Sequence, residues 1–166
     1  MTVAELNTCD RDAFVTALGW IFEDSPWVAE RAWTRRPFRS LDELHAAMTD
    51  IVRAASEHEK LTLLRAHPDL GTRARVSAAS AGEQKGAGLD ALTSAEFARL
   101  QRLNDDYRTR FGFPFLLAVK GSTKHDVLAA LERRRGRSRD EELAEALSQV
   151  DKIARLRLED SCGTTG

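Results

Sequence analysis

The chain of 166 residues has only two cysteines, Cys9 and Cys162, and they lie near opposite ends. Because there is no Cys-x-x-Cys pair and no cysteine framework, the sequence argues against a zinc ribbon and favours a reduced compartment. The four histidines include no His-x-x-x-His pair, so no metal-ligand set is recognisable. We therefore expect no metal.

Long apolar runs and an excess of one charge are absent as well. The longest apolar run, Phe113 to Val119, is far shorter than the roughly 20 residues that a membrane-spanning helix requires. With 25 Lys and Arg against 26 Asp and Glu, the net charge is -1, so no bulk positive field attracts nucleic acid or anionic lipid. The first ten residues lack the basic start and apolar core of a secretory signal. We expect a cytoplasmic protein with no nucleic-acid or membrane partner.

What the sequence does contain is typical of a soluble globular protein. Hydrophobic residues make up 42% and charged residues 31%, and the length suits one domain with its own core. Apolar residues recur at helical spacing along nearly the whole chain, whereas the alternation typical of strands is hard to find. The sequence therefore predicts an all-α fold, a single-domain bundle of about seven to nine helices. We expect this domain to span residues 1–166, with a flexible tail from about residue 159 to 166.

Capping residues mark the expected helix starts. Asp10 can cap a first helix whose apolar face extends to Ile21, and Ser25 followed by Pro26 is typical of a second start. Thr123 can cap a later helix, and Gly112 is placed to end the helix before it. Four more starts share the capping-box pattern, in which Glu follows Ser or Thr by three residues: Ser40/Glu43, Ser80/Glu83, Thr93/Glu96 and Ser138/Glu141.

Two connections differ from ordinary surface loops. Residues 67–92 contain four glycines and few large apolar side chains, so their backbone can approach a ligand closely. Residues 112–121, with the sequence GFPFLLAVKG, are too short and too apolar for an exposed loop. They predict a buried extended or briefly helical segment whose backbone groups need partners. The basic run Arg133 to Arg139 is interpreted as a solvated helix end.

His67 and Glu83 are the candidates for chemistry. His67 ends a helix just before Pro68, where the helix macrodipole favours a protonated imidazolium, as suits a proton donor near neutral pH. The alternative is a histidine that only hydrogen-bonds terminal carbonyl groups. Glu83 is either the structural partner in a capping box or a carboxylate facing a cleft beside Gln84, whose amide can bind ureido or imide groups.

Arg157 lies on the otherwise apolar face of the last helix. Its stem can cover the core while its charged head reaches water, or its guanidinium can be buried and clamp a carboxylate with a bidentate pair. The residues alone leave both possibilities open.

Four motifs occur in order along the chain: HPDLG (67–71), S-x-x-EQ with GAGLD after it (80–90), LNDDYRTRFGFPF (103–115) and IARLRL (153–158). Together they resemble the OHCU decarboxylase family, whose members decarboxylate 2-oxo-4-hydroxy-4-carboxy-5-ureidoimidazoline (OHCU) in the oxidation of urate to allantoin. The resemblance extends from about Asp10 to Leu158. It implies an all-helical carboxy-lyase that forms (S)-allantoin.

The resemblance also implies the residues of the site. His67 matches the family's catalytic histidine, and Glu83 matches its catalytic glutamate. The positions matched to substrate binding are Pro68, Ser80, Gln84, the backbone of Phe115, Leu116, Leu117, Ala118 and Val119, and Arg157. OHCU is the implied small-molecule partner, and a homodimer is the implied assembly.

The reaction fits these residue types without a cofactor. Loss of CO2 leaves an electron pair that the substrate's own unsaturated, carbonyl-bearing ring can delocalise, so no pyridoxal, thiamine or metal is required. The residues alone also allow two other functions. One is a helical protein-interaction module without catalysis, in which His67 and Glu83 only end and cap helices. The other is a ureido or amide hydrolase in which Glu83 activates water.

Overall fold

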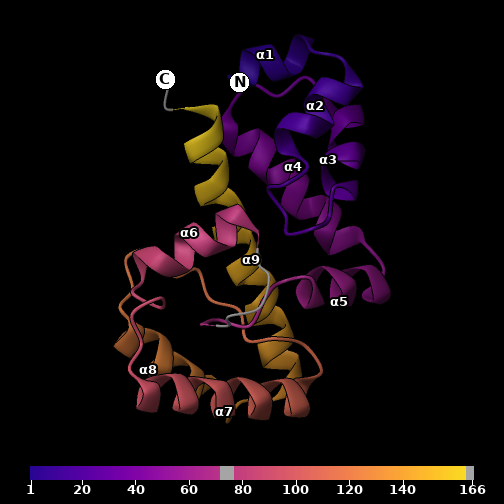
Figure 1. Ribbon diagram of the computed structural model, residues 1–166. Helices are drawn as coiled ribbons and strands as arrows, with labels where there is room; N and C mark the ends of the chain where they lie inside the picture. Colours follow the sequence, from indigo (N-terminus) through magenta and orange to yellow (C-terminus); the bar gives the residue numbers. More distant parts are fainter. Residues whose placement is uncertain (72–76, 164–166) are drawn as a thin grey trace. The chain divides into compact units, whose positions relative to one another are not determined.

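The computed structural model describes residues 1–71 and 77–163, and this part of the chain is built from helices without any strand (Figure 1). The all-α prediction is confirmed, and the helix number agrees with the expected range. The α-helices are α1 (Val3–Thr8), α2 (Arg11–Leu18), α3 (Trp27–Ala32), α4 (Leu41–Ala54), α5 (Glu57–Arg65), α6 (Ala78–Gly86), α7 (Ser94–Phe111), α8 (Lys124–Arg134) and α9 (Arg139–Cys162). A short 3-10 helix, η1 (Trp33–Arg35), directly follows α3.

The helices form two compact units. The terminal unit comprises Met1–Ala66 and Asp151–Gly166, and the central unit comprises His67–Val150. α9 contributes to both, because its residues up to 150 belong to the central unit and those from 151 onward to the terminal unit. Each unit has its own buried apolar side chains.

In the terminal unit, α3 packs against both α2 and α4 (Figure 1). The sequence of α4 explains its formation, because the Ser40 side chain accepts a hydrogen bond from the Glu43 N–H at its start and apolar residues follow at intervals of three and four. The buried residues of α4 are Leu44, Met48, Ile51 and Val52. The Phe14 ring of α2 meets the Trp33 ring edge to face, with centroids 5.7 Å apart.

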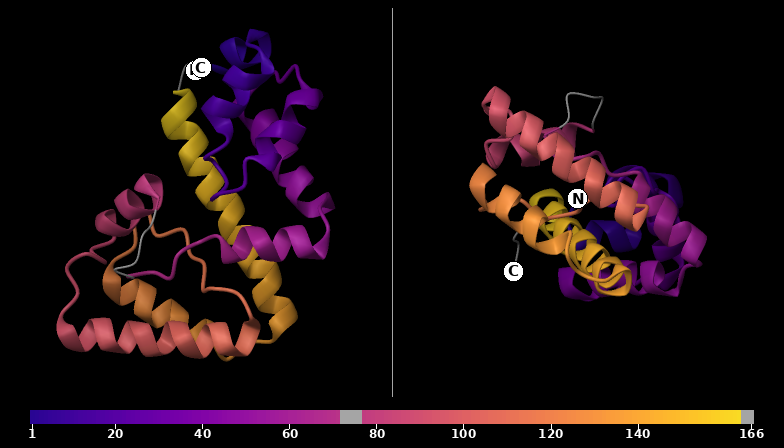
Figure 2. Two further views of the ribbon diagram at one scale, coloured as in Figure 1. Left: turned by 45° about the vertical axis from the view of Figure 1, so that its right-hand side comes forward. Right: turned by 90° about the horizontal axis from the view of Figure 1, so that it is seen from below.

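In the central unit, α7 and α8 pack side by side (Figure 2). Complete capping boxes open both helices, Thr93 with Glu96 for α7 and Thr123 with Asp126 for α8. α7 ends as predicted at Gly112, whose φ of +81° is the left-handed conformation that glycine adopts without strain. The buried residues of α7 are Leu100, Leu103, Asn104, Tyr107 and Phe111.

The predicted start of α6 is wrong. The helix begins at Ala78 because Ser77, and not Ser80, is the cap: the Ser77 side chain accepts a hydrogen bond from the Ser80 N–H at 3.1 Å. Ser80 and Glu83 therefore lie inside the helix and form no capping box. The structural explanation that the sequence offered for Glu83 is thereby removed.

The connection between α2 and α3 also differs from the prediction. α2 ends at Leu18, so Ile21 is buried in the irregular segment after the helix. α3 has Pro26 as its cap residue and no side-chain cap bond, because the Ser25 hydroxyl donates to the Glu23 carbonyl at 2.8 Å instead. The local cap signal at Ser25 is overridden by a bond inside the turn.

α9 is longer than expected at its C-terminal end. It begins where predicted, since the Ser138 side chain accepts a hydrogen bond from the Glu141 N–H at 3.2 Å. The helix continues through Cys162, so residues 159–162, which the prediction placed in the tail, are helical. The last part of the expected tail, 164–166, lies outside the described residues.

Candidate active site

His67 lies directly after α5. That helix ends at Arg65 with Ala66 as its C-cap, so the chain leaves helical geometry before Pro68, as predicted. His67 is buried, with 6% of its surface exposed, and Pro68 is half-buried. The imidazole is thus a buried group at a fixed point of the chain, as a proton donor requires.

One face of α6 brings together three other candidates. Ser80 and Gln84 are buried one helical turn apart, and Glu83 is half-buried beside them. Because residues three and four apart share a helix face, these residues present a hydroxyl, a carboxylate and an amide to the same side of α6. A face with three polar groups of different chemistry can bind a small polar ligand by several hydrogen bonds at once.

The loop that follows His67 is tied to α6 and α7 by two side-chain amides. Gln84 Oε1 accepts a hydrogen bond from the Gly71 N–H at 2.8 Å, and Asn104 Nδ2 donates to the Leu70 carbonyl at 3.0 Å. Gln84 therefore has a structural bond that the sequence did not predict. Its acceptor oxygen holds the loop, which leaves the donor NH2 group for a ligand.

Two further contacts fix the end of this loop. Arg108 on α7 forms an ion pair with Asp69, with 2.7 Å between Nη2 and Oδ1. Gly71 has a φ of +72°, and a Cβ at this position would lie 2.4 Å from Leu100 Cδ2. The positive φ disfavours any residue with a side chain, and a Cβ would also make the Leu100 side chain shift. The HPDLG motif is thus explained by the packing of the loop on α7.

Residues 113–119, called the extended segment below, form no helix and are mostly buried, as predicted. Its aromatic side chains lie against the Tyr107 ring of α7, with centroid distances of 6.1 Å for Phe113 and 5.4 Å for Phe115. Two of its backbone groups have side-chain partners. The Leu116 carbonyl accepts from Arg134 Nη1 at 2.6 Å, and the Ala118 N–H donates to a glutamine oxygen on α9 at 2.9 Å.

Behind the extended segment lies a buried polar network that sequence reasoning missed. Arg134 Nε and the Tyr107 hydroxyl both donate to Glu142 Oε1, at 2.9 and 2.5 Å, and Arg137 Nη1 lies 3.2 Å from Oε2 of the same carboxylate. Burial, reinforced by the hydrogen bond to Glu142, raises the pKa of Tyr107. The tyrosine therefore stays protonated and acts as a donor.

The interpretation of the basic run as a solvated helix end is wrong for Arg134, which is 3% exposed. A signal for its burial was present in the sequence. Arg134 follows Val127 and Leu131 by seven and three residues, so it continues the apolar stripe of α8.

Arg157 is buried, so the snorkelling alternative is excluded. Its Nη2 lies 2.9 Å from Glu23 Oε2, and its Nη1 donates to the Trp20 and Ile21 carbonyls at 3.3 Å each. These contacts all lie in the terminal unit, whereas His67 belongs to the central unit. The structure thus groups the other candidate residues in one unit and places Arg157 in the other.

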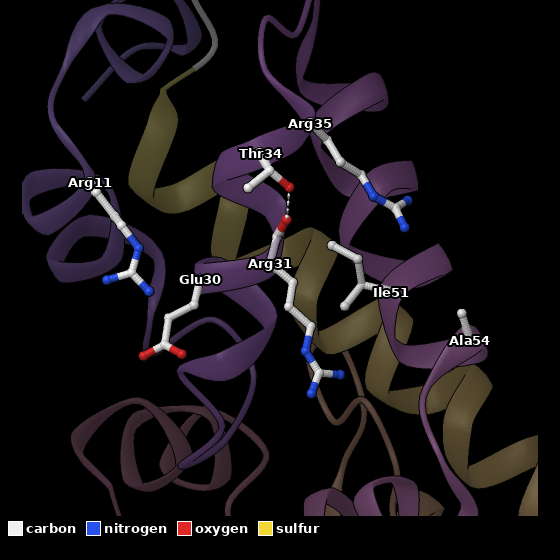
Figure 3. A pocket seen from close by; sticks show the side chains of 7 residues that line it. All are labelled: Arg11, Glu30, Arg31, Thr34, Arg35, Ile51 and Ala54. Atoms are coloured by element: carbon white, nitrogen blue, oxygen red, sulfur yellow. Dashed lines mark hydrogen bonds between the residues drawn. The ribbon is translucent and has the colours of Figure 1, made fainter.

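A pocket of about 460 Å³ in the terminal unit contains none of the candidate residues. Its lining residues are Arg11, Glu30, Arg31, Thr34, Arg35, Ile51 and Ala54 (Figure 3). The guanidinium groups of Arg11 and Arg35 lie apart, on either side of the Arg31 side chain, and Arg31 is ion-paired with Glu59 at 2.5 Å. The pocket therefore offers no converging set of groups for catalysis.

The described ranges, 1–71 and 77–163, contain no side-chain cluster suited to a metal ion and no helix suited to crossing a membrane. No three His, Cys, Asp or Glu side chains there gather in a way that could hold a metal ion. Among the helices in these ranges, none is both long and apolar enough to cross a membrane.

The geometry defines an all-α protein in which a buried histidine, a half-buried glutamate and a buried extended segment belong to one compact unit. The family model for OHCU decarboxylase matches residues 7–159. The chain therefore belongs to the OHCU decarboxylase family.

Individual relatives agree with this assignment. The chain is 50% identical over 158 residues to a 2-oxo-4-hydroxy-4-carboxy-5-ureidoimidazoline decarboxylase of Haloferax volcanii, covering 95% of this chain and 94% of the relative. It is 46% identical over 159 residues to the uric acid degradation bifunctional protein PucL of Bacillus subtilis, covering 96% of this chain and 32% of the relative. The crystal structure of (S)-allantoin synthase is similar with a TM-score of 0.78 and 38% identity, over 97% of this chain and 54% of that one.

Proposed function

We propose that this protein is a carboxy-lyase that converts OHCU to (S)-allantoin in urate degradation. The observation that supports this most directly is the placement of His67, the polar face of α6 and the extended segment in one compact unit of a chain that belongs to the OHCU decarboxylase family. These are the positions that the motif resemblance assigns to catalysis and substrate binding. Relatives of matching length carry the name of the decarboxylase.

In this proposal His67 is the proton donor and Glu83 the second catalytic residue. Breaking the bond between the ring carbon and the carboxylate releases CO2 and leaves its electron pair delocalised over the substrate's carbonyl-bearing ring. The protein has to hold the ring, orient the carboxylate out of the ring plane and deliver one proton to one face. Glu83, near the departing carboxylate, assists by repulsion or by polarising the substrate hydroxyl. No cofactor takes part in these steps.

Substrate binding is assigned to Pro68, Ser80, Gln84 and the backbone of residues 115–119. The hydroxyl of Ser80 and the amide of Gln84 share the face of α6 that carries Glu83, which suits a ligand rich in ureido and carbonyl groups. Arg157 is included because of the motif resemblance, and its ion pair with Glu23 gives it a structural contact of its own.

The decisive experiment is incubation of the purified protein with freshly generated OHCU after treatment with a chelator. We expect accelerated decarboxylation and a single enantiomer, (S)-allantoin, detected by circular dichroism during turnover. Hydrolysis of a ureido bond would favour the hydrolase alternative, and no reaction would favour the interaction module. Activity that is abolished by chelation and restored by one metal would contradict the cofactor-free mechanism.

The stereochemistry tests the role of His67 separately. Spontaneous decarboxylation exposes both faces of the delocalised intermediate to water and should give a racemic product. A racemic product formed at an accelerated rate would mean that the intermediate leaves before protonation, so the decarboxylase assignment would stand and the proton-donor role of His67 would be wrong.

We also propose that both units together form one decarboxylase domain, that the protein is a homodimer and that it acts in the cytoplasm. The family model supports a single domain because it matches continuously from residue 7 to 159. Light scattering after size exclusion should give twice the chain mass. A monomeric mass with full activity would contradict the dimer.

A further inference from the structure

We infer that Arg134 and Gln149 are positioning residues for substrate binding, and that they set the extended segment so that the backbone N–H and C=O of Leu117 bind the ureide edge of the substrate. The inference rests on the proposed function, because it assigns groups to the substrate of that reaction. It adds two residues outside the four sequence motifs and separates the backbone of residues 115–119 into groups held by the protein and groups left for the ligand.

Arg134 and Gln149 hold the same side of the segment. Arg134 Nη1 donates to the Leu116 carbonyl at 2.6 Å, and Gln149 Oε1 accepts from the Ala118 N–H at 2.9 Å. Both side chains are at most 5% exposed. In an extended chain the backbone groups of every second residue point to the same side, so residues 116 and 118 direct these groups toward α8 and α9.

The aromatic side chains hold the segment in a second direction. Phe113 and Phe115, two residues apart, both lie edge to face against the Tyr107 ring. The Arg134 guanidinium also lies over the Phe115 ring, 4.5 Å from its centroid. Because side chains and backbone groups of an extended chain point in perpendicular directions, these contacts prevent the segment from rotating or slipping by one residue.

Leu117 is the half-buried residue between the two held ones, and this arrangement leaves both of its backbone groups for a ligand. Its backbone groups point away from the side occupied by those of residues 116 and 118, and neither bonds to any residue in the described ranges. Leu117 is half-buried, and backbone groups in such a position need a partner. One donor and one acceptor on the same extended residue match a cyclic amide or ureide edge, which presents C=O and N–H side by side.

The orientation of Arg134 is itself fixed. Its Nε donates to Glu142 Oε1 at 2.9 Å, and the carboxylate also receives the Tyr107 hydroxyl and Arg137. Further hydrogen bonds offset the cost of burying an ion pair, and the Leu116 carbonyl supplies one of them to Arg134 Nη1. The substrate-binding backbone is thereby connected to the most deeply buried charges of the central unit.

The kinetic test uses Gln149→Leu and Arg134→Lys, with Thr93→Ala, which removes the side-chain cap of α7, as the control for lost stability. Leucine removes the acceptor for the Ala118 N–H, and lysine keeps the charge next to Glu142 but loses the planar fork that reaches Leu116. We expect KM for OHCU to rise about tenfold in each variant, the effect of about one hydrogen bond, with kcat within about twofold. Thr93→Ala should lower Tm but leave KM unchanged, because Leu116 and Ala118 stay held.

Amide hydrogen exchange on the wild-type protein tests the same inference without any variant. The Ala118 N–H should be protected in the free protein, and the Leu117 N–H should become protected only when (S)-allantoin is added. This measurement decides the matter even if Gln149→Leu fails to fold.

The outcomes separate this inference from the proposed function. If wild-type protein neither consumes OHCU nor binds (S)-allantoin, the proposed function is wrong and the inference falls with it. If wild-type protein is active but both folded variants keep the wild-type KM, or Thr93→Ala raises KM equally, Arg134 and Gln149 are only structural. Allantoin binding without protection of the Leu117 N–H would overturn the assignment of Leu117.

Discussion

In the terminal unit, buried Arg157 pairs with Glu23 at 2.9 Å and donates to two carbonyl groups of the irregular connection between α2 and α3. In the central unit, buried Arg134 pairs with Glu142 at the same distance and donates to a carbonyl group of the extended segment. Burying an arginine and a glutamate is costly, and in each unit backbone carbonyl groups accept further hydrogen bonds from the guanidinium, although Arg134 Nη2 is buried without a partner among the described residues.

The two supported segments differ in what their backbone does. Residues 19–26 close on themselves through bonds such as Ile21 N–H to the Leu18 carbonyl and Ser25 N–H to the Phe22 carbonyl. The extended segment has no such local bonds from residue 113 to 118. A buried arginine–glutamate pair thus stabilises a closed turn in the terminal unit. In the central unit such a pair holds an extended segment whose free backbone groups can bind a ligand.

The largest effect should be the loss of decarboxylase activity on substitution of residues in the central unit. His67→Ala and Glu83→Gln, both in the central unit, should lower kcat by about 10²–10⁴-fold, the usual contribution of a general acid or base. Tm should stay near the wild-type value for Glu83→Gln, because glutamine keeps the size of the side chain and α6 is capped by Ser77. A folded variant that decarboxylates OHCU at the wild-type rate would remove that residue from the mechanism.

Breaking the Arg157–Glu23 ion pair of the terminal unit should mainly lower stability. Arg157→Met leaves Glu23 buried without its charged partner and should lower the free energy of unfolding by about 3–5 kcal/mol, measured by urea denaturation. The double variant Arg157→Met/Glu23→Gln removes the unpaired charge and should recover most of that loss. If Arg157 also binds substrate, as the motif resemblance implies, the double variant still shows a raised KM. Recovery of both stability and KM would show that Arg157 is purely structural.

Two serines of the central unit should separate helix capping from substrate binding. Ser77→Ala removes the cap of α6 and should cost about 1 kcal/mol of stability, with little change in kcat/KM. Ser80→Ala, one turn into the helix on the face of Glu83, should raise KM instead. Tm and steady-state kinetics of the two variants are measured side by side. A KM that rises only in Ser77→Ala would assign substrate binding to Ser77 and not to Ser80.

The smallest effect concerns the ion pair between α7 and α8. The hydrogen bond from Lys124 and the capping bond from the Thr93 N–H lower the pKa of Glu96 from 4.5 to about 2. Since the folded value is the lower one, the carboxylate stabilises the fold above about pH 4.5, and this contribution is lost as the pH falls toward 2. Glu96→Gln should therefore lower Tm slightly at pH 7. This difference in Tm between variant and wild type should disappear as the pH falls from about 4.5 to about 2. A difference in Tm that stays constant over this pH range would contradict the lowered pKa of Glu96.

Local signals in the sequence predicted much of the fold. Thr93 with Glu96 and Gly112 marked both ends of α7, because caps and left-handed glycines act through bonds that span only three or four residues. The same rule failed at Ser80. Ser77 and Ser80 are both acceptable caps locally, and the choice between them leaves the Ser80 side chain buried.

The sequence by itself determined the helical class, most helix ends and the buried character of residues 113–119, because periodicity, caps and an apolar run containing proline are properties of neighbouring residues. Only the tertiary structure decided which polar groups are buried and what they hold. Arg134 reaches a carbonyl 18 residues away, and Arg157 reaches a carboxylate 134 residues away. Contacts over such separations depend on the packing of whole helices, so the role of each arginine could not be inferred from its neighbours in the chain.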